Sequence, residues 1–218
     1  MSGTGPTLLL LWCLGAFLAG SVPFGLVLVK LAGKGDVRSH GSGNIGATNV
    51  SRVGGKALGI VTLLLDIAKG WLPVFLALHW KLEWNAVALV ALCAVLGHVF
   101  TPWLKFRGGK GVATALGTAL ALDPLWVVPS AVLFAVVLLA TRYVSLGSVL
   151  GSALMPMTLW LFMTRFPVWM FIQEPLIGFV LWTAVFLLVI AKHHENIRRL
   201  LKGAESPLWG KKKEPSDA

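Results

Sequence analysis

Charged residues, and acidic ones above all, are scarce in this sequence. Only 13% of its 218 residues are charged, and nine Asp or Glu stand against nineteen Lys or Arg, a formal net charge of +10. A soluble domain carries about 25% charged residues, so the composition excludes an ordinary water-soluble globule. With 56% hydrophobic residues and a mean hydropathy of +0.80, the chain is predicted to be an integral membrane protein.

Cysteine is also rare. Cys13 and Cys93 both lie in apolar runs and have no Cys-x-x-Cys spacing, so nothing indicates a disulfide framework or a zinc site. No His or carboxylate cluster has metal-ligand spacing either, and we expect neither a metal nor a cofactor. Because no Lys or Arg precedes Leu8, the positively charged region of a signal peptide is missing. The first apolar run is therefore expected to be a retained span.

Six apolar stretches divide the sequence, and five of them suit one transmembrane helix each. A bilayer core of roughly 30 Å takes about 17 to 25 apolar residues per helix, and the five runs cover residues 7–29, 57–78, 85–103, 146–163 and 175–191. The sixth stretch, 111–140, is broken once by Asp123-Pro124. It can form one long tilted helix or a tight hairpin of two shorter ones.

The placement of cations favours the hairpin, because cytoplasmic loops collect Lys and Arg. With a turn at Asp123-Pro124, only Lys81 and Arg165 fall outside and Lys69 lies within a span. The other cations share the cytoplasmic side: Lys30, Lys34, Arg38, Arg52, Lys56, Lys105, Arg107, Lys110, Arg142, Lys192, Arg198, Arg199, Lys202 and Lys211 to Lys213. One long helix would instead export Arg142 and the basic C-terminus.

The resulting prediction is an all-α polytopic membrane protein with seven transmembrane helices, its N-terminus outside and its C-terminus cytoplasmic. One span is too short, because residues 111–122 would rise only roughly 18 Å. This helix must be shielded by its neighbours or extend into the preceding glycine-rich loop.

The first long polar segment, residues 30–56, carries groups that suit phosphate. Gly41, Gly43 and Gly46 match G-x-G-x-x-G, but a transmembrane helix precedes them where the dinucleotide fingerprint needs a strand, so a Rossmann site is rejected. Glycines still let amide N–H groups converge on an anion, and Ser42, Asn44, Thr48, Asn49 and Arg52 add donors. If 44–53 is helical, Thr48 and Arg52 share one face. The alternative is a flexible loop whose glycines merely turn the chain.

The second segment, residues 98–114, places cations beside glycines at a helix start. It is not a Walker A loop, because Leu104 stands where the first glycine belongs and Gly111 follows Lys110. A helix start with cations and free amides can nevertheless hold an anion. The groups that would do so are Lys105, Arg107, Gly108, Gly109 and Lys110. The alternative is a cationic cluster that only fixes topology.

The third segment, residues 192–205, follows the last span. Continued as a helix, it places His193 and Asn196 at i, i+3 on one face that points back toward the membrane surface. Histidine has the unperturbed pKa nearest neutrality, roughly 6.5. We assign His194, Arg199 and Lys202 instead to a solvated juxtamembrane helix that binds anionic lipid.

Polar residues also lie at or within the spans. Ser145 and Ser148, at the cytoplasmic start of the sixth span, either cap that helix or donate to a ligand. Asp66 and Lys69 are three residues apart within the second span and can pair. An intramembrane charge suggests function by default, but we expect this pair to be structural.

Together these segments resemble one family, the bacterial membrane acyl-phosphate:glycerol-3-phosphate acyltransferases (PlsY). The matching pieces follow the family's order and cover almost the whole chain: GSVPFG at 20–25, SGNIGATNV at 42–50 with Arg52, LDIAKG at 65–70, GHVF at 97–100 with KFRGGKGVAT at 105–114, and HHENIRRL at 193–200 with Gly203 and Glu205.

The resemblance implies transfer of a fatty acyl group from acyl phosphate to the sn-1 hydroxyl of glycerol 3-phosphate, giving lysophosphatidic acid and phosphate without coenzyme A. It implies that the catalytic residues are Ser42, Arg52, Lys105, His193 and Asn196. The implied substrate-binding residues are Gly43, Asn44, Gly46, Thr48, Asn49, Gly108, Gly109, Lys110, Ser145 and Ser148. Arg52 and Lys105 would neutralise the phosphates. His193, oriented by Asn196, would take the proton or position substrate while a phosphate oxygen takes it.

The implied setting is phospholipid biosynthesis in the bacterial inner membrane, with the site facing the cytoplasm. Residues 1–209 would form one membrane-embedded acyltransferase domain and 210–218 a basic, disordered cytoplasmic tail. The expected partners are the two substrates and membrane lipids, without nucleic acid, and the chain is expected to be monomeric. The His-x4-Asp motif of acyltransferases that use acyl-CoA or acyl carrier protein is absent. The remaining alternative is a phosphate or anion transporter, although the predicted outer loops offer few polar groups.

Overall fold

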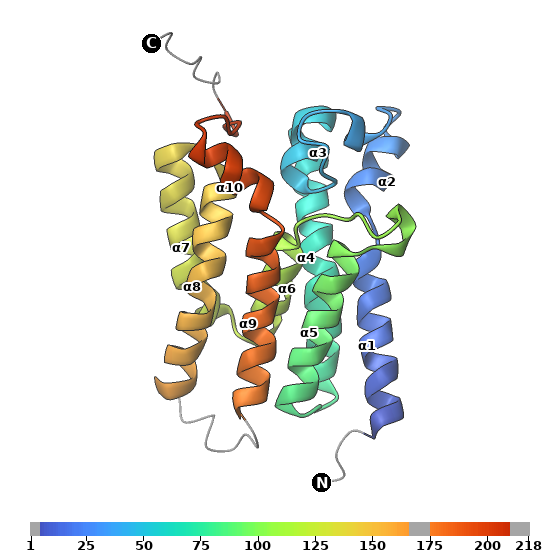
Figure 1. Ribbon diagram of the computed structural model, residues 1–218. Coiled ribbons are helices and arrows are strands. Elements are labelled where there is room, and N and C mark those ends of the chain that lie inside the picture. Colours follow the sequence, from blue (N-terminus) through green and yellow to red (C-terminus); the bar gives the residue numbers. More distant parts are fainter. Residues whose placement is uncertain (1–4, 166–174, 210–218) are drawn as a thin grey trace.

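The computed structural model describes residues 5–165 and 175–209, and every regular element within these ranges is a helix. The bundle (Figure 1) consists of α1 (Pro6–Ser21), α2 (Phe24–Leu31), α3 (Ala47–Gly54), α4 (Lys56–His79), α5 (Trp84–Val99), α6 (Val112–Leu122), α7 (Pro124–Thr141), α8 (Val144–Arg165), α9 (Pro175–Ala191) and α10 (His194–Leu201), with short 3₁₀ turns at Val37–Ser39 and Pro102–Leu104. The predicted tail 210–218 and most of the loop 164–174 lie outside the described residues.

Every predicted apolar run is mainly helical, and the runs 7–29 and 111–140 form two helices each. Five candidate spans are long and apolar enough to cross a bilayer, at Pro6–Leu31, Lys56–His79, Trp84–Leu104, Pro124–Thr141 and Val144–Arg165. The helix α9 reaches this length only together with α10, from which it is bent by 51°, and α6 is a shorter apolar helix. The chain is therefore an all-helical, multi-pass membrane protein.

The first span is not one continuous helix as predicted. The backbone is extended at Val22 and α2 begins after Pro23, because proline has no N–H to donate and keeps the preceding residue out of the helical region. The carbonyl of Val22 instead accepts a 2.7 Å hydrogen bond from Nζ of Lys69. Lys69 also pairs with Asp66 at 2.7 Å, and both side chains are buried. The predicted ion pair between Asp66 and Lys69 therefore exists, and Lys69 also binds the backbone at the break in the first span.

The stretch 111–140 forms two helices rather than one. Asp123 caps α7 by accepting a 2.7 Å hydrogen bond from the Leu125 amide, and Pro124 occupies the first turn, where a missing N–H costs nothing. The short helix α6 packs against α4 through glycines. A Cβ on Gly117 would collide with the Ile67 carbonyl, and one on Gly70 with the Thr114 carbonyl. Neighbouring helices therefore shield α6, one of the two expected solutions.

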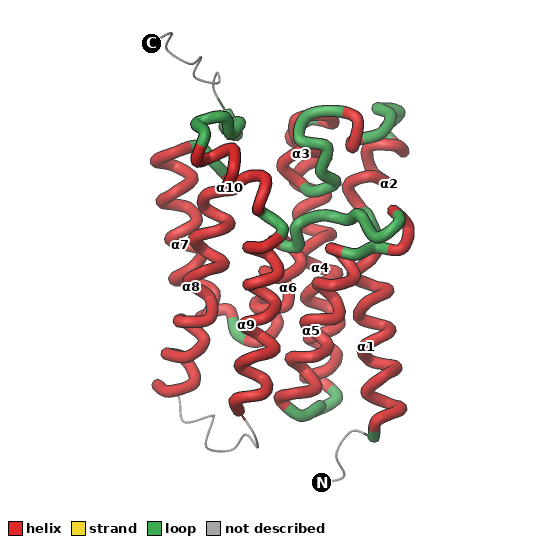
Figure 2. The backbone as a smooth tube through the Cα atoms, in the orientation of Figure 1, coloured by secondary structure: helices red, strands yellow, loops and turns green. Residues whose placement is uncertain are grey.

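The polar segments gather at one end of the bundle. Figure 1 shows α3 and α10 at the end of the bundle opposite the turn between α4 and α5. The loop between α5 and α6 crosses the bundle below them (Figure 2). The last span does not continue straight into α10, because the chain bends at Lys192 and His193. These three segments surround one cavity.

Candidate active site

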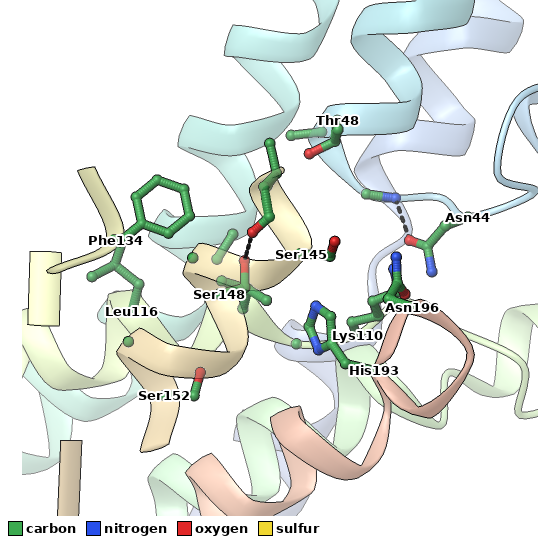
Figure 3. Close-up of a pocket in the computed structure, with 18 of the residues that line it drawn as sticks. Asn44, Thr48, Lys110, Leu116, Phe134, Ser145, Ser148, Ser152, His193 and Asn196 are labelled. Carbon is green, nitrogen blue, oxygen red and sulfur yellow. Dashed lines mark hydrogen bonds between the residues drawn. The ribbon is translucent and has the colours of Figure 1, made fainter. Parts of the chain in front are cut away.

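A cavity of about 850 Å³ opens at the polar end of the bundle and extends down between α6, α7 and α8. Its polar part is lined by residues from all three sequence-predicted segments, namely Gly41, Ser42, Asn44, Gly46, Thr48, Asn49, Arg52, Lys110, His193, Asn196, Arg199, Glu205 and Ser206. Figure 3 shows Asn44, Lys110, His193 and Asn196 facing one another across it. Residues more than 150 positions apart in the chain therefore line one cavity.

The loop before α3 is ordered by Asn49. Its Oδ1 accepts from the Ser42 amide at 2.9 Å, and its Nδ2 contacts the carbonyl oxygens of Val37, His40 and Asn44 at 2.9–3.1 Å. Asn49 is buried, and its polar atoms are engaged within the loop. Although it lines the cavity, Asn49 holds the loop in shape, so its predicted role as a substrate ligand is not what this geometry supports.

Several other predicted residues of this segment have polar groups that are free to contact a ligand in the cavity. Asn44 uses Oδ1 to accept from the Gly46 amide at 2.8 Å, which leaves its Nδ2 available (Figure 3). The helix begins at Ala47 rather than Asn44, and Thr48 and Arg52 both line the cavity from it. Gly43 lies outside the lining, with a φ of +68° that shapes the turn.

Arg52 already binds two backbone carbonyls. Its Nη2 donates to the oxygens of Ser206 and Pro207 at 3.2 and 3.3 Å. Burial lowers the pKa of Arg52, and Glu205 opposes that effect, but a guanidinium keeps its charge in proteins. A cation held beside the cavity by weak, exposed carbonyl contacts is available to an anionic ligand.

Lys110 is the cation that the second segment delivers to the cavity. Gly108 and Gly109 place it there: their amides donate to the carbonyls of Val99 and His98 at 3.0 and 3.1 Å. A Cβ on either glycine would collide with His98. These glycines lie outside the cavity lining, so their contribution is close packing and not the predicted phosphate contact. Burial lowers the pKa of Lys110 to about 8, with Glu205 opposing and Arg199 adding to the shift.

Lys105 lies outside the cavity, contrary to the predicted catalytic role. It is exposed, has a left-handed backbone with φ of +53°, and does not line the site. The chain turns back between Lys105 and Lys110. Only Lys110 therefore points into the cavity, although both cations were predicted to bind one anion.

His193 is buried at the bend between α9 and α10. Its Nδ1 lies 2.7 Å from the Val189 carbonyl oxygen, and since a carbonyl only accepts, Nδ1 carries the hydrogen and Nε2 is the acceptor of the neutral ring. Burial lowers the pKa of His193 to about 4, and the nearby charge of Lys110 contributes to the shift. His193 is therefore neutral at pH 7.

Asn196 does not orient His193, which corrects the predicted pairing. Its Nδ2 donates to Oε1 of Glu205 at 2.7 Å. The chain bends at the start of α10, and the Val189 carbonyl on α9 orients the imidazole of His193 instead. The buried Oδ1 of Asn196 has no hydrogen-bond partner among the described residues, so it can accept from a ligand hydroxyl in the cavity.

Glu205 is the centre of the site's internal network and was absent from the predicted site residues. It accepts from Ser145 at 2.8 Å, from Asn196 at 2.7 Å and from Arg199 at 2.7 Å. Burial acts to raise the pKa of Glu205, but these three hydrogen bonds together lower it below its usual value. Arg199, predicted to be a solvated lipid contact, is instead half of an ion pair at the cavity wall.

The lower part of the cavity is mostly apolar, with Ser130 and Ser152 as its polar lining residues. Ser148 lines the transition, but its hydroxyl donates to the Val144 carbonyl of its own helix at 2.8 Å, which is the local bond that serine forms in helices. Beyond it lie Leu63, Leu116, Val127, Ala131, Phe134, Leu138, Met155 and Phe186. Figure 3 shows Leu116 and Phe134 on the side away from Lys110 and His193.

This fold and cavity define a class: a multi-pass helical membrane protein that can hold an anionic group at a cationic, hydrogen-bonding mouth and an aliphatic chain in an adjoining apolar arm. A sequence model of glycerol-3-phosphate acyltransferases matches residues 10–203. The chain belongs to the glycerol-3-phosphate acyltransferase family and is an acyltransferase.

Similar proteins cover nearly the whole chain. A glycerol-3-phosphate acyltransferase of Trichlorobacter lovleyi is 50% identical over 199 residues, which is 90% of this chain and 96% of the relative. One of Geobacter sulfurreducens is 47% identical over 192 residues, 88% and 93% of the two chains. A crystal structure of PlsY (YgiH), an integral membrane glycerol 3-phosphate acyltransferase, in its glycerol 3-phosphate form, is 37% identical with a TM-score of 0.82. It covers 93% of this chain and 96% of that chain. The lysophosphatidic acid form gives a TM-score of 0.78.

Proposed function

We propose that this protein transfers a fatty acyl group from acyl phosphate to the sn-1 hydroxyl of glycerol 3-phosphate. The observation that carries the proposal is the single cavity in which Arg52 and Lys110 meet an apolar arm. A donor with a phosphate head and an acyl tail matches both parts, and a glycerol phosphate fits the polar mouth. The names of the relatives support the acceptor, and the crystal forms of PlsY name glycerol 3-phosphate and lysophosphatidic acid.

Two cations and several neutral hydrogen-bond donors recognise the phosphate. Arg52 exchanges its carbonyl partners for a phosphate, to which a guanidinium can bind with two parallel hydrogen bonds, and Lys110 supplies a second positive charge. Nδ2 of Asn44, the hydroxyls of Ser42 and Thr48, and the amide groups of the loop complete the shell. The free Oδ1 of Asn196 accepts from a glycerol hydroxyl.

The reaction is a single acyl transfer. The sn-1 oxygen attacks the carbonyl carbon of the acyl phosphate and forms the new ester C–O bond, and the bond between that carbon and the phosphate oxygen breaks. Negative charge develops on the carbonyl oxygen and on the departing phosphate, where fixed cations stabilise it. The hydroxyl proton ends on the released phosphate, so the products are lysophosphatidic acid and inorganic phosphate.

His193 orients the attacking hydroxyl in this scheme. Because Nδ1 is bound to the Val189 carbonyl, Nε2 accepts a hydrogen bond from the sn-1 hydroxyl. A pKa of about 4 makes His193 a weak base, whereas a phosphate with a second pKa near 6 is a stronger one. Acyl phosphate is an activated donor, so the phosphate takes the proton and His193 fixes the geometry.

The membrane arrangement belongs to the same proposal. All seven helical runs cross or enter the bilayer of the bacterial inner membrane, with the N-terminus outside and α3, α10 and the cavity mouth on the cytoplasmic side. The cations at this end of the bundle support that orientation under the positive-inside rule. The proposal includes a monomeric enzyme, because residues of one chain supply both the polar mouth and the apolar arm of the cavity.

One assay tests the proposal directly. Purified protein in detergent receives glycerol 3-phosphate with either acyl phosphate or acyl-CoA, and both lysophosphatidic acid and free phosphate are measured. We expect equal amounts of both products from acyl phosphate and none from acyl-CoA. Turnover with acyl-CoA would overturn the donor assignment. Anion flux in liposomes without acyl transfer would establish the transporter alternative instead.

Two variants test the residue roles. Arg52→Ala should reduce kcat/KM about 100-fold or more, as loss of a charged transition-state contact does, and near-normal turnover would refute the phosphate assignment. His193→Gln retains a hydrogen-bond acceptor. It should keep more activity than His193→Ala if His193 orients the hydroxyl, whereas equal and complete loss in both variants would identify His193 as the base.

A further inference from the structure

A loop between α5 and α6 presents aromatic and cationic side chains outside the active-site cavity. This loop, residues 102–107, is called the headgroup loop below. Its Trp103 and Phe106 are 64% and 61% exposed, and Lys105 and Arg107 are exposed beside them. Figure 2 shows the loop projecting from the bundle beside the base of α2. None of these four side chains lines the cavity.

The loop is held in this shape by many hydrogen bonds. The Trp103 indole donates to Oγ of Ser21 at 2.8 Å, and Thr101 donates to the Ser21 carbonyl at 2.7 Å. Within the loop, the amides of Phe106 and Arg107 donate to the carbonyls of Thr101 and Leu104 at 2.9 and 3.1 Å. Its exposed groups are therefore fixed on the end of α1.

The backbone is strained where the side chains are turned outward. Lys105 and Phe106 have φ values of +53° and +61°, a left-handed conformation that bulky residues rarely adopt. Strain of this kind persists where the surrounding structure enforces it and tends to accompany function. Glycine would adopt this conformation without strain, but neither residue is a glycine. The strained positions therefore keep the side chains of a lysine and a phenylalanine.

The depth of the loop matches a membrane interface. The helices α1 and α5 have 16 residues each, which rise about 24 Å, and the loop lies at their shared end. In a bilayer core of about 30 Å this end is close to the headgroup layer. Tryptophan is enriched there and Lys and Arg extend toward the headgroups.

From this geometry we infer that the headgroup loop is a binding site for the phosphate of an anionic phospholipid in the surrounding leaflet. Lys105 and Arg107 hold the headgroup while Trp103 and Phe106 rest on its glycerol and upper acyl region. Lys192, whose Nζ lies 5.3 Å from the Phe100 ring centre, adds a third cation. The loop contains no Asp or Glu that would repel such a lipid.

The ligand is a lipid rather than a soluble substrate because of the loop's surroundings. Soluble phosphate would gain nothing from Trp103 and Phe106, and the cavity, where Lys110 lies, is separated from the loop by Gly108 and Gly109 packed on His98. Lipid binding at the headgroup loop is a property separate from acyl transfer in the cavity.

Lipid retention by the full-length chain tests the inference. Native mass spectrometry in detergent would compare the affinity for phosphatidylglycerol with that for phosphatidylcholine in the parent protein and in K105Q/R107Q. We expect the double variant to bind phosphatidylglycerol about twenty-fivefold more weakly, since each cation near an anionic surface contributes about fivefold. K81Q/R165Q removes two exposed cations elsewhere and should leave the affinity unchanged.

Two further measurements separate the alternatives. K105G removes the cation and relieves the backbone strain, so it should unfold at a higher temperature yet still lose phosphatidylglycerol. In detergent, K105Q/R107Q should retain acyl transfer within twofold. The inference is overturned if the double variant retains the lipid like the parent, if excess inorganic phosphate displaces it, or if turnover in detergent collapses, which would assign these cations to soluble substrate.

Discussion

Asn196 and Glu205 are joined by a 2.7 Å hydrogen bond across the turn that ends α10. The turn reverses the chain at Gly203, which has a φ of +63°. Through this contact the carboxylate fixes the amide nitrogen of Asn196, whose amide oxygen has no partner among the described residues and faces the cavity. The same carboxylate also binds Ser145 of α8, so one side chain sets the distance between two walls of the site.

Replacing Glu205 by Gln should therefore destabilise the protein by about 2–3 kcal/mol, since hydrogen bonds to charged groups contribute about 1.5–3 kcal/mol each. The measurement is reversible unfolding in mixed detergent. Glu195→Gln is the matched control, because Glu195 is 72% exposed and lies 4.0 Å from Arg199, and an exposed pair contributes at most about 1 kcal/mol. Equal effects of the two variants would contradict the central role of Glu205.

The pH dependence of catalysis should show the lowered pKa of Lys110. Lys110 carries its charge below a pKa of about 8 and loses it above. If the charge is needed for phosphate binding, kcat/KM for glycerol 3-phosphate falls roughly tenfold between pH 7 and pH 9, because this parameter follows the free enzyme's ionisations. Lys110→Arg cannot lose its charge, so its profile should be flat over this range. A decline that persists in Lys110→Arg would assign the ionisation to another group.

Loss of Lys69 should be severe. Lys69→Met would leave Asp66 buried without its cation and the Val22 carbonyl without its donor, and breaking a buried pair in this way costs about 3–5 kcal/mol. Thermal unfolding would show the loss, and the double variant Asp66→Asn with Lys69→Met should recover part of it. Lys56→Ala, an exposed change at the start of the same helix, should lie within about 0.5 kcal/mol of the parent. A fully stable Lys69→Met variant would contradict the role of the pair.

The contact between α6 and α4 gives a steric prediction. Gly117→Ala places a Cβ against the Ile67 carbonyl, and overpacking of this kind costs about 1–3 kcal/mol. We expect lower stability and lower turnover, because α6 carries part of the apolar arm. Gly15→Ala has open space around the new Cβ and should stabilise its helix by about 0.5–1 kcal/mol. Similar unfolding temperatures for the two variants would refute close packing at α6.

The sequence predicted the helices from local signals, and it predicted that three polar segments lie at one end of the bundle from the distribution of cations along the chain. Apolar run length located the spans, and Asp123-Pro124 separated α6 from α7 through capping and the missing proline amide. Val22-Pro23 carries only half of that signal, because no side chain caps α2 and a single proline near the end of a span can also make a mild kink. What closes that break is Lys69, a contact 47 residues away that no local pattern specifies.

Within the site, residue type was more predictable than residue role. Asn49 and Asn196 carry the same amide, yet Asn49 uses its polar atoms on its own loop while Asn196 retains a free oxygen. Lys105 and Lys110 are equally basic in sequence, and only the left-handed turn at 105–106 sends one outward and the other inward. Glu205 was missed as a site residue because its partners Ser145 and Arg199 lie on separate helices.

The shortness of α6 sets the depth at which the chemistry takes place. Eleven residues rise about 16 Å, roughly half of a bilayer core, and Lys110 lies just before this helix begins. The loop that carries Lys110 crosses the bundle below α3 and α10 (Figure 2), next to the apolar arm of the cavity. A water-soluble acceptor must enter the cavity from the polar end of the bundle, whereas the acyl donor need not be extracted from the membrane. The enzyme thereby avoids the cost of exposing an aliphatic tail to water, and its product is already at lipid depth when it forms.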